Sequence, residues 1–191
     1  MVRGKMRDKK VAIYQAALRR VNRVGYGGLT MQELAKDAKL ATGTVYLYFE
    51  NKEDLVNEII MDTKSEMMET IYKDTEENEP LYPYFKKIVS NYLDYGTTHT
   101  DKIIFLEQFY RSEFLTNETR SSLKEIWMPF FQYLCAPRNE MLLKDSNREI
   151  MLSGFEGAIR QIILNINSSN LPYTKLLRDQ IVDMLWSSIR R

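Results

Sequence analysis

A short run, residues 42–48, gathers side chains that can hydrogen-bond to a partner molecule but includes no histidine, cysteine, lysine or carboxylate that could act as a catalytic base. Threonine and tyrosine hydroxyls can donate to phosphate oxygens, threonine methyl groups can contact apolar base substituents, and glycine permits close approach. Val45 and Phe49 form an apolar i, i+4 pair that faces the other way. The run therefore predicts a short helix that is anchored on one side and displays its other residues outward. The displayed residues are Thr42, Gly43, Thr44, Tyr46, Leu47 and Tyr48.

The side chains that catalysis requires are scarce in this sequence. The one histidine, His99, lies in the polar run 97–100, where a capping or solvent-facing role is expected. The single cysteine, Cys135, permits neither an internal disulfide nor a CxxC site, which suits a reducing compartment such as the cytoplasm. No His/Cys cluster has metal-ligand spacing. We therefore predict no catalytic residue, no metal site and no cofactor, and we do not expect an enzyme.

Three helix starts are expected to position the run 42–48. Thr30 and Glu33 have the spacing of a capping box, in which hydroxyl and carboxylate satisfy backbone amides reciprocally. Thr42 is the N-cap candidate of the second, short helix. Asn51 with Asp54 predicts the start of a third, longer helix. The order is therefore helix, tight turn, short helix, and then the first turn of a long helix.

This arrangement resembles the DNA-binding motif of the TetR family of bacterial transcriptional regulators. The resemblance rests on Thr30, Gly43-Thr44, Tyr46-Leu47-Tyr48-Phe49 and Lys52-Glu53-Asp54-Leu55, and it covers about 50 residues. The sequence departs from the family in the turn, where glycine is usual and this chain has Ala38-Lys39-Leu40. If this turn requires a positive φ, Lys39 costs about 1–2 kcal/mol relative to glycine.

The resemblance implies a ligand-responsive regulator, commonly a repressor, that binds double-stranded DNA in the major groove. A homodimer would present two motifs to a roughly palindromic operator with half-sites about one helical turn apart. Gln32 and Thr44 are expected to reach base edges, whereas Tyr46, Tyr48 and Lys52 are expected to contact phosphates. The full set of expected DNA-binding residues is Thr30, Gln32, Thr42, Gly43, Thr44, Tyr46, Leu47, Tyr48 and Lys52.

The charge distribution agrees with contact to a polyanion at one end of the chain. Residues 1–55 hold 11 lysines and arginines against 6 aspartates and glutamates, whereas residues 56–191 hold 16 against 20. The overall charge of +1 conceals this asymmetry. The N-terminal ten residues are charged and lack the apolar stretch of a signal peptide, and no apolar run is long enough to span a membrane.

Helical periodicity recurs along the whole chain and strand-like alternation is absent, so we predict an all-α fold of about nine helices. A DNA-binding domain is expected over 1–51 and a helical ligand-binding and dimerisation domain over 52–191. Residues 1–8 are expected to form a basic arm. The predicted helices after the motif cover 81–98, 101–114, 118–135 (kinked at Pro129), 146–166 and 173–190, and they follow a long helix that reaches residue 74.

The last two predicted helices, the eighth and ninth (146–166 and 173–190), each carry two apolar stripes. In the first of them, Met151 and Phe155 begin one stripe and Ile159 and Ile163 begin the other. One stripe is needed for the core, so the other predicts a surface for a second copy of the chain. We therefore expect a homodimer with a four-helix interface.

The region 56–191 holds 17 of the 22 aromatic residues, which predicts a small-molecule pocket for a lipophilic or aromatic effector. The expected ligand-binding residues are Met67, Tyr92, Phe105, Phe109, Trp127, Phe131 and Phe155. Aromatic stripes at helical spacing are also ordinary core. The alternative is therefore a helix-turn-helix DNA-binding factor that has no small-molecule ligand and is controlled by a protein partner.

Overall fold

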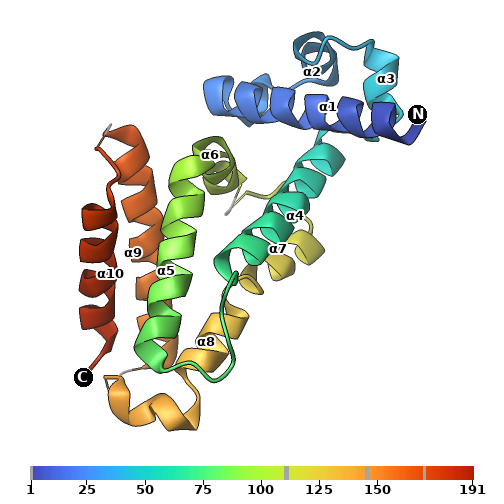
Figure 1. Ribbon diagram of the computed structural model, residues 1–191. Helices are drawn as coiled ribbons and strands as arrows, with labels where there is room; N and C mark the ends of the chain where they lie inside the picture. Colours follow the sequence, from blue (N-terminus) through green and yellow to red (C-terminus); the bar gives the residue numbers. More distant parts are fainter. Residues whose placement is uncertain (1, 110–111, 145–146, 170) are drawn as a thin grey trace. The chain divides into compact units, whose positions relative to one another are not determined.

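The fold is all-α, as the periodicity predicts. A computed structural model describes residues 2–109, 112–144, 147–169 and 171–191, with side chains from residue 6 onward (Figure 1). In this part of the chain there are ten α-helices and two 3₁₀-helices, and the one β-type pairing is a single bridge between Leu143 and Arg190. None of the described helices is both long and apolar enough to cross a membrane.

The elements follow one another with short connections. They are α1 (Val2–Val24), η1 (Tyr26–Gly28), α2 (Met31–Asp37), α3 (Thr42–Tyr46), α4 (Lys52–Ile71), α5 (Leu81–Thr98), α6 (Thr100–Phe109), α7 (Asn117–Lys124), α8 (Met128–Leu134), η2 (Pro137–Leu142), α9 (Arg148–Ser168) and α10 (Lys175–Ile189). The predicted helix 81–98 has the observed bounds of α5. Residues 2–8, which we expected to form an arm, belong to α1; the side chains of residues 2–5 lie outside the described part.

Two predicted helices differ from those observed. The predicted helix 118–135 is wrong as a single kinked element, because the chain forms α7 and α8 with a break between them. Pro129 lies in the first turn of α8, where its missing N–H costs no intrahelical hydrogen bond, so it starts a helix instead of bending one. Of the predicted helix 101–114, the part up to Phe109 is helical as α6, residues 110–111 lie outside the described part, and residues 112–114 are not helical.

The chain divides into two compact units. The first unit comprises Met1–Thr63 and Asp101–Leu123, and the second comprises Lys64–Thr100 and Lys124–Arg191. The first unit therefore holds α1 to α3, the first half of α4, and nearly all of α6 and α7. This grouping cuts across the ranges 1–51 and 52–191, and the functional assignment of those two ranges stays a prediction.

The core of the first unit joins residues that are far apart in sequence. Ile13 and Val21 of α1, Leu34 of α2 and Val45 of α3 are fully buried in one apolar cluster. The residue Phe49 before α4, the first half of α4 and the 101–123 segment complete this cluster; their residues in it include Phe49, Leu55, Ile59, Phe105, Phe109 and Leu115. Burial of side chains of this size stabilises the unit by about 1.5–3 kcal/mol each.

A buried arginine fixes α2 against α1. The Arg20 guanidinium donates from Nη2 to Glu33 at 2.8 Å and from Nε to Asp37 at 2.6 Å. The hydrogen bond from Arg20 holds the pKa of Asp37 below its ordinary value of 3.8. The Glu33 amide donates to the Thr30 hydroxyl at 3.2 Å, which confirms the N-cap. The reciprocal half of the predicted capping box is replaced, because the Glu33 carboxylate binds Arg20.

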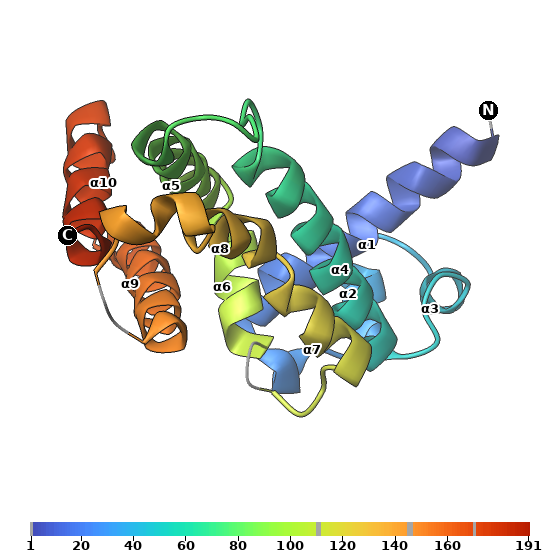
Figure 2. The ribbon, with the colours of Figure 1, turned by 90° about the horizontal axis from the view of Figure 1, so that it is seen from below.

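In the second unit, α5, α9 and α10 lie side by side, as both ribbon views show (Figures 1 and 2). Gly96 lets α9 approach α5, since a Cβ at this position would lie 2.7 Å from the Ile163 Cδ1 atom. Polar pairs join α5 to α10 at both ends. Tyr82 donates to Asp183 at 2.7 Å, and Arg178 donates to Asp94 at 2.5 Å.

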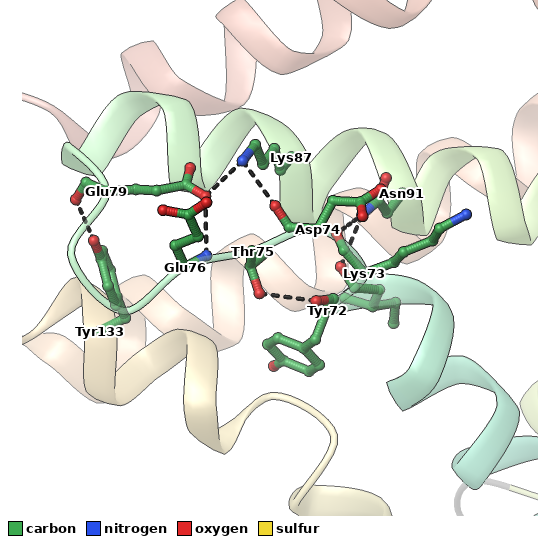
Figure 3. A network of polar contacts seen from close by, with 10 residues as sticks. Tyr72, Lys73, Asp74, Thr75, Glu76, Glu79, Lys87, Asn91 and Tyr133 are labelled. Carbon is green, nitrogen blue, oxygen red and sulfur yellow. Dashed lines mark hydrogen bonds and ion pairs between the residues drawn. The ribbon is translucent and has the colours of Figure 1, made fainter.

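A polar network holds the end of α4 in the second unit (Figure 3). The Asn91 amide donates to the Ile71 and Lys73 carbonyls at 3.0 and 3.1 Å, and Lys87 donates to the Asp74 carbonyl at 2.8 Å. These donors satisfy carbonyls that have no partner within the helix. The Lys87 ammonium also binds the Glu79 carboxylate at 2.5 Å, so α5 holds both ends of the connection 72–80.

Candidate nucleic-acid interface

The two motif helices, α2 and α3, are joined by a tight turn with one unusual backbone conformation. The Ala38 amide donates to the Leu34 carbonyl, and the Leu40 amide donates to the Ala35 carbonyl at 2.8 Å, which closes α2. Between them Lys39 has φ +57°, in the left-handed region. The turn therefore does contain a residue with a positive φ, and that residue is a lysine.

The short helix α3 is anchored on one side and open on the other, as the sequence predicts. Val45 and Phe49 are fully buried. On the other side, Tyr46 is 53% exposed and Leu47 is 83% exposed, which is the largest exposure among the apolar side chains of the described part. Thr44 is half-buried. The N-cap prediction for Thr42 is wrong, because Ala41 occupies that position and Thr42 is the first helical residue.

Gly43 has no structural requirement within the chain. A Cβ built at this position would have no atom within 4 Å, and the residue does not have a positive φ. Glycine in a helix costs about 0.5–1 kcal/mol relative to alanine. Packing within the chain therefore does not explain a glycine in this five-residue helix.

Lys52, the first residue of α4, lies against the ring of Tyr26. The Lys52 ammonium nitrogen lies 4.1 Å from the centroid of the Tyr26 ring, and the Tyr26 hydroxyl donates to Glu53 at 2.6 Å. Burial, and then this hydrogen bond, raise the pKa of Tyr26, while the hydroxyl lowers the pKa of Glu53. Asn51 accepts from the Asp54 amide at 2.8 Å, which confirms the predicted start.

The structure brings the predicted DNA-binding residues together in the first unit. Thr30 and Gln32 are exposed at the start of α2, and residues 42–44 form the start of α3. Tyr48 follows α3 and is half-buried. Helix N-termini carry partial positive charge and unpaired N–H groups, so both starts suit an anion. Contact of each of these side chains with DNA stays a prediction.

Two residues that support this surface were not identified from the sequence. Arg20 fixes α2, and Tyr26 contacts Lys52 and Glu53. From the sequence alone, neither residue can be distinguished from an ordinary surface residue, since one is an arginine on the first helix and the other is a tyrosine within the glycine-rich stretch 25–28. The one available signal was the carboxylate pair Glu33 and Asp37, which lies one helical turn apart and requires a cation.

The predicted ligand-binding residues separate into two groups. In the second unit the Trp127 ring lies 4.9 Å from Tyr92, 5.9 Å from Phe155 and 6.2 Å from Phe131. Met67 is buried in the same unit. Phe105 and Phe109 instead belong to the core of the first unit, where their ring centroids are 4.8 Å apart. Five of the seven residues therefore belong to the second unit and two to the core of the first, and a ligand-binding role for any of them stays a prediction.

An apolar groove lies on the surface of α9 and α10 and has a volume of about 690 Å³. Its floor includes Gly154, where a Cβ would have no neighbour within 4 Å. Ile159 and Ile163 are fully buried. Of the other stripe of α9, Met151 and Ala158 are half-buried at the groove, whereas Phe155 is buried. Apolar residues that line the groove are Ile150, Met151, Phe155, Ala158, Met184, Leu185 and Ile189. Among the residues for which side chains are described, no cluster of histidine, cysteine and carboxylate has the arrangement of a metal site.

Residues 13–59 match the sequence model of the bacterial regulatory proteins of the tetR family. An uncharacterized HTH-type transcriptional regulator of Haemophilus influenzae is 36% identical over 84 residues, which are 44% of this chain and 45% of that protein. The chain thus spans about half the length of the curated relatives it matches.

The fold resembles solved structures along nearly the whole chain. A TetR family transcription regulator from Marinobacter aquaeolei VT8 superposes with a TM-score of 0.86 at 16% identity and covers 98% of both chains. The transcriptional regulator FadR from Bacillus subtilis, solved in complex with stearoyl-CoA, superposes with a TM-score of 0.73 at 20% identity, over 94% of this chain and 98% of that one.

Proposed function

We propose that this chain, whose residues 13–59 match the sequence model of the tetR family of bacterial regulatory proteins, is a DNA-binding transcriptional regulator that acts in the cytoplasm as a homodimer. The observation that carries this proposal is α3, a helix of five residues that exposes Tyr46 and Leu47 while Val45 and Phe49 anchor it. The N-terminal end of such a helix enters the major groove in helix-turn-helix proteins. Residues 42–44 then lie nearest the bases.

Contacts with the DNA backbone fix the position of this helix. Tyr46, Tyr48 and Lys52 donate to phosphates on either side of the groove, and Gln32 and Thr44 contact base edges. Gly43 allows α3 to lie close to the DNA. Two copies of the motif bind a palindromic operator with half-sites about one helical turn apart. Bound at a promoter, the dimer blocks transcription and acts as a repressor.

Dimerisation uses the apolar groove on α9 and α10. Ile150 is 73% exposed and Met184 is 54% exposed at this groove, and such side chains are rarely grouped on the surface of a monomer. A second copy of the same helices, related by a two-fold axis, would bury both grooves against each other. The missing side chain at Gly154 allows the partner helix to approach closely.

A lipophilic effector regulates DNA binding. The aromatic cluster Tyr92, Trp127, Phe131 and Phe155 offers an apolar site in the second unit. The other three rings all pack around Trp127, so an effector that enters the cluster must displace some of them. The FadR structure holds stearoyl-CoA, which makes long-chain acyl-CoA the first compound to test. Binding that differs between two conformations by about 1–3 kcal/mol changes DNA affinity roughly 5–150-fold.

Selection of bound duplexes from a random DNA pool tests the proposal. The expected result is a palindromic consensus that the double variant Tyr46→Ala, Lys52→Ala binds more weakly at every sequence. Thermal unfolding with stearoyl-CoA, palmitoyl-CoA and free CoA then tests the effector class. If the acyl-CoA esters raise the midpoint and release the selected DNA while free CoA does neither, the effector is a lipid. A chain that selects a consensus but responds to no lipophilic compound is the regulator controlled by a protein partner.

A further inference from the structure

Lys39, in the turn between α2 and α3, has a backbone conformation that a lysine side chain disfavours. Its φ of +57° brings Cβ close to a carbonyl oxygen, and glycine is the usual residue at such a position. The other residue with a side chain and a positive φ in the described part is Asp74. Aspartate tolerates this region because its short side chain bonds locally, whereas lysine has no such bond available.

Nothing in the described part of the chain offsets this strain. Lys39 is exposed, and its ammonium has no hydrogen-bond or ion-pair partner among the described residues. Its backbone N–H donates to the Lys36 carbonyl at 3.1 Å, a bond that glycine would make equally well. The nearest carboxylate in sequence, Asp37, is paired with Arg20. Strain without internal compensation points to use of the side chain by an external molecule.

The position of Lys39 beside α3 indicates that this external molecule is DNA. It lies three residues before Thr42, so its Cα is within about 11 Å of the start of α3, given a reach of 3.3–3.6 Å per residue. The major groove is about 12 Å wide. When the start of α3 lies between the two phosphate walls, a flexible lysine side chain at this distance can reach one of them. Its ammonium is then a phosphate donor with no competing partner on the protein.

We propose that Lys39 is a further DNA-binding residue that donates to a backbone phosphate beside the groove that α3 enters. The proposal rests on the proposed function and adds one phosphate contact per motif to those of Tyr46, Tyr48 and Lys52. A phosphate contact raises affinity for all sequences and carries no base preference. A lysine at this left-handed position then lowers the folding stability of the chain and raises its affinity for DNA.

Three substitutions at this position separate charge from strain. Lys39→Gly removes both, Lys39→Asn removes the charge while asparagine tolerates a positive φ, and Lys39→Arg keeps the charge. Each variant is measured against the operator that the wild-type chain selects, at salt concentrations from 50 to 200 mM, and each is unfolded thermally without DNA. Lys39→Arg is the matched control for binding.

Opposite changes in stability and affinity are expected for Lys39→Gly. Its thermal midpoint rises by about 2–8 °C because strain of about 1–2 kcal/mol is relieved. Its affinity at 0.1 M salt falls roughly tenfold per motif, and the slope of log affinity against log salt becomes shallower by about 1 per motif. Lys39→Asn shows the same loss of affinity, and Lys39→Arg keeps the wild-type slope.

The outcomes distinguish this proposal from the proposed function. If Lys39→Gly gains stability but keeps the wild-type affinity and salt slope, Lys39 contacts no phosphate, although the chain still binds DNA. If Lys39→Gly loses affinity for one base sequence only, the side chain reads a base and the phosphate assignment is wrong. A wild-type chain without affinity for any duplex refutes both proposals.

Discussion

Lys52 and Tyr26 form a cation–π pair in which the ammonium nitrogen lies 4.1 Å from the ring centroid. The Tyr26 ring is itself held, 4.1 Å from the Phe114 ring and 5.3 Å from the Phe109 ring. A lysine that is already restricted loses less side-chain entropy when it binds a partner. Tyr26 therefore positions Lys52 for its proposed phosphate contact.

This relationship predicts that Tyr26 and Lys52 act as a unit in DNA binding. Lys52→Ala should weaken binding to all duplexes and make the salt dependence shallower by about 1 per motif. Tyr26→Leu should reproduce part of this loss, and adding Tyr26→Leu to Lys52→Ala should cost little more. The measurement is a double-mutant cycle of DNA affinity at two salt concentrations.

Tyr26→Phe is the control for this cycle, since it keeps the ring and removes the hydrogen bond to Glu53. It should retain the wild-type salt slope. Strictly additive losses in the cycle would show that Tyr26 supports folding alone and does not position Lys52.

Gly43→Ala should make the protein more stable and bind DNA less tightly. The added methyl group has no atom within 4 Å, so the helix gains about 0.5–1 kcal/mol. In the complex the same methyl group would occupy space that the DNA requires. Thermal unfolding measures the expected gain in stability, and titration of the same preparation with DNA measures the expected loss of affinity. Unchanged affinity with increased stability would mean that α3 does not approach DNA at Gly43.

Leu47 should contact a thymine methyl group, because an apolar side chain that is 83% exposed has no role within the chain. Replacing thymine by uracil at single positions of the selected operator removes one methyl group at a time. One position per half-site should weaken wild-type binding roughly fourfold, equivalent to about 0.8 kcal/mol for one buried carbon. Leu47→Ala should be insensitive at that position. Equal sensitivity of both proteins would assign the methyl contact to another residue.

Ile150→Glu and Met184→Glu should convert the homodimer to monomers. Both side chains are exposed at the groove of α9 and α10, so each charge would be buried at the interface without a partner. Sedimentation velocity measures the result, and circular dichroism should remain helical. Ile163 and Ile181 of the same two helices are buried within one chain, so charged variants there would unfold it and could not test the interface. Dimers that survive both surface substitutions would place the interface elsewhere.

Acid should weaken the first unit through Asp37. The hydrogen bond from Arg20 lowers the pKa of Asp37, so the pair contributes stability above the ordinary value of 3.8 and loses it as pH falls towards the lowered value. The difference in free energy of unfolding between the wild-type chain and Asp37→Asn is the wild-type advantage. It should therefore be constant from pH 7 to 5 and shrink below pH 4. Urea unfolding at each pH measures it. An advantage as large at pH 2 as at pH 7 would exclude ionisation of Asp37 as its source.

Local signals predicted the motif well because they depend on neighbours in sequence. The Thr30 and Asn51 caps and the buried pair Val45 and Phe49 are all set within four residues. The membership of Phe109 in the first unit was not predictable in this way, because its partner Tyr26 lies more than 80 residues earlier and an aromatic stripe does not reveal which core it joins.

The same limit applies to the two stripes of α9. Periodicity showed that both exist, but only the contact of Ile163 with Gly96 identifies the inner one. The break before α8 was hidden for a different reason. A proline in an apolar run predicts a kink or a start equally well, and Met128 and Pro129 begin a new helix.

The segment Asp101–Leu123 belongs to the first unit although the chain on both sides of it belongs to the second. A fragment that ends at Thr63 would lack Phe105, Phe109 and Leu115 and would expose the apolar surface that they cover. Hybrid regulators built from this chain would therefore need two grafted pieces, with 101–123 exchanged together with the N-terminal helices. A single junction after the motif would leave each recipient with a mismatched core.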